Sequence, residues 1–71
     1  SFQQGVRIMF VVTAQKTFYS GHLKGLSVPY ACEFPMKCIA EQAKDALEKS
    51  CKDINDDLVR YTSVKITAIA K

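Results

Sequence analysis

Apolar residues recur at steps of three and four between residues 36 and 58. The members of this stripe are Met36, Ile39, Ala40, Ala43, Leu47, Cys51, Ile54 and Leu58. Such a period places the side chains on one side of an α-helix. Pro35 suits the first helical turn, and the acids that follow Asn55 are unfavourable at a helix C-terminus. The pattern predicts a helix over 36–54, ending near Ile54 or Asn55, with Leu58 in the turn that follows.

The segments on either side of this helix alternate with a period of two, which is typical of strands. A first strand is predicted at 6–14 and a last strand at 59–69. In the first strand, one face is apolar throughout and should meet the helix: Val6, Ile8, Phe10, Val12 and Ala14. In the last strand, the predicted core face consists of Thr62, Val64, Ile66 and Ala68, and Tyr61, Ser63, Lys65 and Thr67 form the other.

The stretch 17–32 is either one bent strand or two short ones, and Pro29 favours an edge position because it cannot donate to a ladder. The predicted fold is therefore α+β: a small sheet of three to four mostly antiparallel strands on one α-helix, as a single domain over 1–71. The helix connects the strand before it to the last strand by a crossover that should be right-handed. The last strand would then be parallel to a neighbouring strand, provided that this neighbour runs parallel to the strand before the helix. Residues 1–4 are predicted to be a frayed start.

The second face of the first strand is only partly polar, because Met9 and Val11 lie in its middle. A half-apolar back face predicts a second covering layer, such as another subunit. The length gives the same indication, since a chain of 71 residues with 48% apolar composition builds a marginal core by itself. We therefore expect a homo-oligomer or a bound protein partner rather than an isolated monomer.

Charge is unevenly distributed along the chain, whose formal net charge is +3. The segment 36–58 carries four lysines and six acids, whereas the rest carries six cations and the single acid Glu33. This pattern predicts a mildly acidic helix and a basic sheet with its loops. The apolar run at 6–12 is too short to span a membrane and contains Arg7, so no membrane association is expected.

The three cysteines lie at spacings that match no metal or redox motif. Cys51 belongs to the apolar stripe and is predicted to be buried, whereas Cys38 falls on the opposite side of the helix and should be exposed. A disulfide between Cys32 and Cys38 is an alternative that would leave Cys51 free. An odd number of cysteines fits a reducing compartment better, so reduced thiols and a cytoplasmic location are expected.

The residues most suggestive of ligand binding lie between residues 16 and 25. This stretch combines cations, which can hold phosphates, with aromatic rings, which can stack on unpaired bases. The candidate set is Lys16, Phe18, Tyr19, His22 and Lys24, joined by Arg60 and Lys65 if these share a sheet surface. The alternative interpretation is a hairpin whose aromatic residues are packing residues.

Catalytic chemistry finds little support in the sequence. His22 and the cysteines show no zinc-ligand spacing, and the glycines form no phosphate-binding fingerprint. Cys38 lies near the start of the helix, a position at which catalytic thiols occur, but no base is placed beside it by the sequence. We expect neither an enzyme nor a cofactor. The favoured interpretation is a small module that binds proteins, a regulator or inhibitor, and associates with itself through Met9 and Val11; the alternative is a nucleic-acid-binding module.

Overall fold

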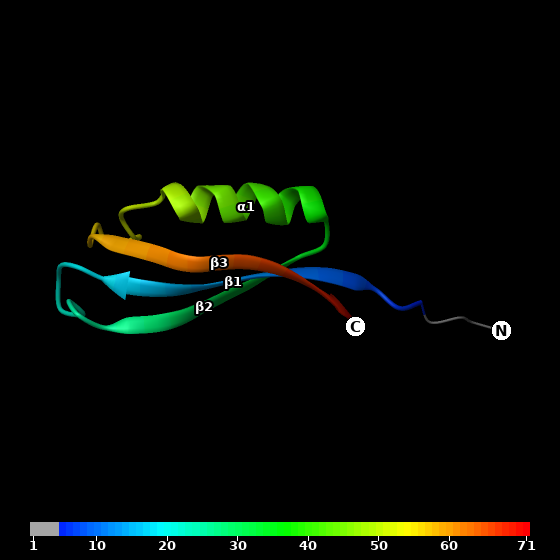
Figure 1. Cartoon of the computed structure of the whole chain (residues 1–71), viewed down its shortest axis with the longest axis horizontal. Coiled ribbons are helices and arrows are strands. Elements are labelled where there is room, and N and C mark those ends of the chain that lie inside the picture. The colour runs from blue at the N-terminus through cyan, green and yellow to red at the C-terminus, as the bar shows by residue number, and fades with distance from the viewer. Residues whose placement is uncertain (1–4) are drawn as a thin grey trace.

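The computed structural model describes residues 5–71, so the expectation for 1–4 lies outside the described residues. Its elements are strand β1 (Ile8–Phe18), strand β2 (Ser27–Phe34), helix α1 (Lys37–Lys49) and strand β3 (Val59–Ala70). The strands form one sheet in the order β2-β1-β3, and the helix lies along one face of it (Figure 1). The predicted α+β fold is confirmed, with three strands.

The central strand β1 is antiparallel to both of its neighbours. Strands β2 and β3 therefore run parallel to each other with β1 between them, and α1 connects them. The stretch 17–32 contains one strand of its own rather than two: β1 continues to Phe18, residues 19–26 form the connection, and β2 begins at Ser27. Strand β2 lies at an edge of the sheet, as Pro29 predicts. A backbone hydrogen bond of 2.9 Å from Gly25 N–H to the carbonyl of Phe18 closes this connection.

The helix is shorter than the periodicity predicts, and this part of the prediction is wrong. It ends at Lys49, and the N–H of Ser50 closes the last turn on the carbonyl of Leu47. Cys51 is consequently exposed rather than buried, and Ile54 is 98% exposed in the loop that follows. Here Asp53 accepts hydrogen bonds from the backbone N–H groups of Asn55 and Asp57, which stabilise a turn in place of helix.

Strand β3 contains a bulge that changes which residues face the helix. The pairing with β1 shifts by one residue between Thr13 and Gln15, and Ser63 adopts a positive φ of 53°. Val64 and Ile66 face the helix as predicted, but before the bulge the helix side is occupied by Val59 and Tyr61 instead of Thr62. The predicted face assignment is therefore wrong for Thr62 and Tyr61, because one extra residue reverses the alternation.

The core between helix and sheet is thin. Among the described residues, the buried apolar side chains are Val12, Ala14, Phe18, Ala40 and Val59. The helix lies over β3 and β1 more than over β2. The start of β1 and the end of β3 extend beyond the helix in Figure 1, and accordingly Val6 and Ile8 of the predicted core face remain exposed. The apolar face of β1 does meet the helix at Val12 and Ala14.

Candidate functional site

The sheet face opposite the helix has no covering element within residues 5–71. The register places four cations around a band of threonine and apolar residues on this uncovered face. The cations are Arg7, Arg60, Lys65 and Lys71, and Glu33 is the acid on the same face. This surface can contact a partner by apolar burial at its centre and by positive charge at its margins.

Met9 and Val11 lie on this uncovered face, in the middle strand, and both are half-buried. Their partial burial has a local cause. The ammonium group of Lys71, beside β3, reaches across β1 to both carboxylate oxygens of Glu33 in β2, at 2.8 and 2.7 Å. The aliphatic part of a lysine covers apolar surface in such an arrangement. An interface at Met9 and Val11 remains a prediction.

The basic and aromatic residues that were grouped from the sequence do not share one surface. Lys16 and Phe18 point to the helix side of β1, where Phe18 is buried. Arg60 and Lys65 lie on the uncovered face, on the same strand but on either side of the bulge. Tyr19, His22 and Lys24 belong to the connection between β1 and β2, where all three are exposed.

The side chain of Lys16 is mostly buried and contacts a carboxylate and two aromatic rings. Its ammonium lies 3.5 Å from a carboxylate oxygen of Asp53, 4.8 Å from the ring centre of Phe18 and 5.8 Å from that of Tyr61. Charge pairing and cation–π contact fix it beneath the loop after the helix. Tyr61 in turn meets Tyr30 edge to face, with ring centres 5.5 Å apart. Lys16 thus joins this loop to the sheet.

Asp53 is a residue that the sequence interpretation missed. Its side chain is only 6% exposed. Burial raises the pKa of its carboxyl, but the N–H groups of Asp57 and Asn55 and the ammonium of Lys16 outweigh burial, so that the pKa lies below its ordinary value of 3.8. The sequence signal was the Asp53-x-Asn55 pattern, since Asp commonly accepts a hydrogen bond from the N–H two residues later.

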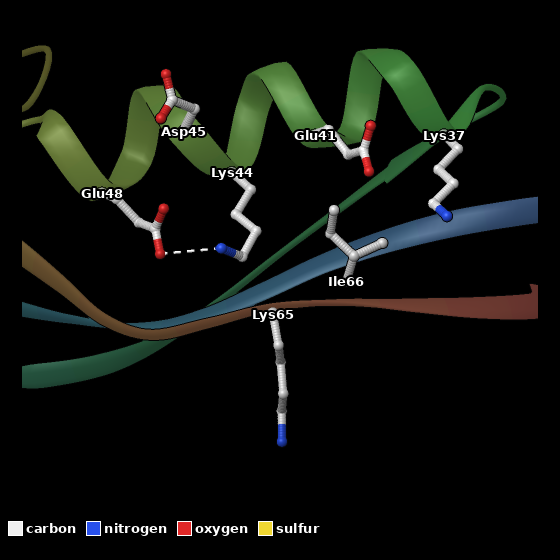
Figure 2. A pocket seen from close by; sticks show the side chains of 7 residues that line it. All are labelled: Lys37, Glu41, Lys44, Asp45, Glu48, Lys65 and Ile66. Atoms are coloured by element: carbon white, nitrogen blue, oxygen red, sulfur yellow. Dashed lines mark hydrogen bonds and ion pairs between the residues drawn. The ribbon is translucent and has the colours of Figure 1, made fainter.

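A shallow hollow of about 510 Å³ opens along the flank of the helix above β3. Figure 2 shows Lys37, Lys44 and Glu48 extending from the helix toward this strand, with Ile66 rising toward them and Lys65 directed away on the other side of the sheet. Lys44 and Glu48 form an ion pair of 3.0 Å. The hollow is lined by charged side chains above an apolar floor.

The cysteines are free thiols, and Cys38 is exposed as predicted. Burial, and then the neighbouring Cys32, raise the pKa of Tyr30. Within residues 5–71, no group of three or more His, Cys, Asp or Glu side chains is arranged to hold a metal ion. No helix in that part of the chain has the length and apolar character needed to cross a bilayer.

Comparison of the chain with protein-family models, with curated proteins and with solved structures finds no match. The functional interpretation therefore rests on the surfaces described above.

Proposed function

We propose that this chain is a non-enzymatic binding module, a regulator or inhibitor, that acts through protein–protein contacts and associates with itself through its sheet. The observation that carries this proposal is the imbalance between buried and exposed apolar side chains. The buried set is small, while large apolar residues are exposed in β1, in α1 and in the segments that flank and connect the elements: Val6, Ile8, Tyr19, Leu23, Leu26, Met36, Ile39, Ile54 and Leu58. Apolar surface of this extent is typical of protein interaction sites.

The first test is the solution mass of the purified chain, measured by light scattering after gel filtration. The expected result is a mass at least twice the 7.9 kDa of one chain. A mass of one chain at all concentrations up to about 1 mM would contradict self-association, because weaker contacts lie outside the range of specific interfaces.

A second candidate function is nucleic-acid binding by the uncovered sheet face. The supporting observation is the charge of this face: Glu33, its acid, is paired with Lys71, which leaves Arg7, Arg60 and Lys65 available for phosphates. An oligonucleotide titration by fluorescence anisotropy tests it. Affinity that falls steeply with added salt, and is lost in the Arg60→Glu/Lys65→Glu variant, would support this candidate. Absence of binding in about 50 mM salt would contradict it.

A reducing compartment such as the cytoplasm forms part of the main proposal, because Cys38 and Cys51 are exposed free thiols. Alkylation monitored by mass spectrometry tests whether Cys38 has catalytic character. A binding module should show labelling of Cys38 no faster than that of Cys51. Selective fast labelling of Cys38 would indicate an activated thiolate and would count against a non-enzymatic role.

A further inference from the structure

The outer edge of β3 is open over most of its length. At its beginning the edge is closed, because Lys52 bridges to Leu58 and the N–H of Val59 bonds to the carbonyl of Cys51 at 3.0 Å. From residue 60 to residue 70, no strand within the described part of the chain pairs with this edge. Unpaired N–H and C=O groups in such a row form a template for another strand. The opposite edge, β2, is protected by Pro29, which cannot donate a hydrogen bond.

The helix presents a regular charge pattern above this open edge. Four helix residues that line the hollow along β3 form this pattern: Lys37, Glu41, Lys44 and Glu48 (Figure 2). Asp45 also borders the hollow, but its carboxylate points away from the sheet and pairs with Lys49. The spacing of the four residues, by four, three and four positions, places them on one stripe of the helix surface. The signs alternate from the first turn to the last. When a second copy of the stripe is placed beside the first in the opposite direction, each lysine of one copy lies opposite a glutamate of the other.

A stripe of this kind is complementary to itself in an antiparallel arrangement. A twofold axis through the middle of the stripe brings Lys37 of one copy opposite Glu48 of the other, and Glu41 opposite Lys44. The same axis brings the two β3 edges together antiparallel, because the helix and β3 run along each other (Figure 1). A twofold contact needs one surface that fits its own copy. The charge pattern and the open edge meet this requirement together.

We propose that two copies of this chain associate through β3, forming a continuous six-stranded sheet with the two helices side by side on one face. The occupant of the open edge is thus a second copy, bound by β-strand addition and by the charged helix flank. This inference rests on the proposed function, since it specifies the surface through which the chain associates with itself. It places that surface at β3 and α1 rather than at Met9 and Val11.

The dimensions of the fold are compatible with this dimer. Paired strands lie about 4.8 Å apart. A helix placed between β1 and β3 would then be separated from its copy by about 10 Å, which is within the range for packed helices. Pairing centred on Ile66 sets Val64 opposite Ala68 beneath the helices, and sets Lys65 opposite Thr67 on the other face. The Lys65 side chains of the two copies therefore do not lie opposite each other.

Charge reversal in two complementary variants tests the proposal. The variant Lys37→Glu/Lys44→Glu makes the stripe wholly acidic, and the variant Glu41→Lys/Glu48→Lys makes it wholly basic. Each variant alone should dimerise at least tenfold more weakly than the wild-type chain, as measured by sedimentation equilibrium, because like charges then face each other. An equimolar mixture should recover a heterodimer, detectable by native mass spectrometry. Circular dichroism verifies that each variant is folded.

The matched control is Lys49→Glu/Lys52→Glu, which changes the net charge as much as the acidic variant but alters lysines outside the stripe. Its dimerisation should equal that of the wild-type chain. The wild-type chain supplies a measurement without mutation: its dimer should weaken several-fold between about 0.05 and 1 M salt, because salt screens exposed ion pairs.

The outcomes separate this inference from the proposed function. A wild-type dimer that neither charge reversal nor salt weakens, but that Met9→Glu/Val11→Glu dissociates, would overturn the β3 interface and leave self-association in place. A wild-type chain that is monomeric up to about 1 mM would overturn both. Equal weakening by the stripe variants and by the control would also overturn the β3 interface, since net charge alone would then explain the effect.

Discussion

The backbone of Ser63 adopts a conformation that costs energy for any residue except glycine. Its φ of 53° lies in the left-handed region, where the Cβ of an L-residue is crowded by about 1–2 kcal/mol. Ser63→Gly removes this crowding, at the expense of some additional entropy in the unfolded chain. We expect the substitution to raise the free energy of unfolding by about 0.5 kcal/mol, measured by urea denaturation.

Two comparison variants test whether the backbone of Ser63 is strained at this bulge. Ser63→Val should destabilise the fold by about 1–2 kcal/mol, because a β-branched residue tolerates the left-handed region poorly. Thr62→Gly, one residue earlier in ordinary strand geometry, should also destabilise it. A Ser63→Gly variant that loses as much stability as Thr62→Gly would show that the bulge does not carry the strain.

Asp53 makes the stability of this fold dependent on pH in the acid range. Because the folded pKa of Asp53 lies below its ordinary value of 3.8, the carboxylate stabilises the folded chain at pH values above about 4. This stabilisation is lost as the pH falls through the lower, folded pKa. We expect Asp53→Asn to lower the urea midpoint at pH 7, and expect the difference from the wild-type chain to shrink as the pH falls below about 4.

The matched control is Asp45→Asn, which removes an exposed carboxylate that pairs with Lys49 at 3.0 Å. Its effect should be no more than a few tenths of a kcal/mol at either pH, because exposed pairs contribute little. An Asp53→Asn deficit of the same size at pH 2 and pH 7 would exclude the charge of Asp53 as its cause.

At the scale of elements, the sequence predicted what depends on local periodicity. The alternation of β1 and β3 and the three-to-four spacing from Met36 to Leu47 each identified the element. The alternation also identified the helix-facing side of β1, and that of β3 beyond the bulge. The helix end was missed because Cys51 and Ile54 continue the spacing by chance, while the hydrogen bonds of Asp53 stabilise a turn there. The spacing of apolar residues does not reveal that a turn stabilised by an Asp side chain competes with the helix at this point.

The candidate site was less predictable than the fold, for a related reason. Whether Lys16 and Phe18 face a ligand or the helix depends on where β1 ends, and turn signals at the strand ends were ambiguous. The bulge at Ser63 had a detectable signal, since the apolar alternation passes from Tyr61 to Val64 in three steps instead of two. The pairing of Lys16 with Asp53 joins segments far apart in the chain, and no local pattern encodes it.

The contact of α1 with the sheet depends on one small residue. Ala40 is completely buried between helix and sheet. A larger side chain at this position forces the helix away from β1 and β3, which costs about 1–3 kcal/mol. We expect Ala40→Leu to lower the free energy of unfolding by that amount, measured by urea denaturation. Gln42→Leu on the exposed side of the helix is the control and should change it by less than about 0.5 kcal/mol.

For the whole molecule, a thin core and an open edge together imply that folding and association are coupled. A dimer that forms only from folded chains gains stability as the protein concentration rises, whereas a monomer does not. We expect the urea midpoint of the wild-type chain to rise with concentration, since a hundredfold increase contributes about 2.7 kcal/mol per mole of dimer once the dimer predominates. Circular dichroism in cells of different path length measures this over the required range.

The Lys37→Glu/Lys44→Glu variant shows whether the concentration dependence of the urea midpoint comes from the proposed β3 interface. Its buried residues are unchanged, so at low concentration its midpoint should approach that of the dissociated wild-type chain. At high concentration the two midpoints should diverge, because repulsion between acidic stripes removes the contribution of the second copy. Parallel curves for both chains would instead mean that association adds stability through another surface, and that β3 is left open for a different protein.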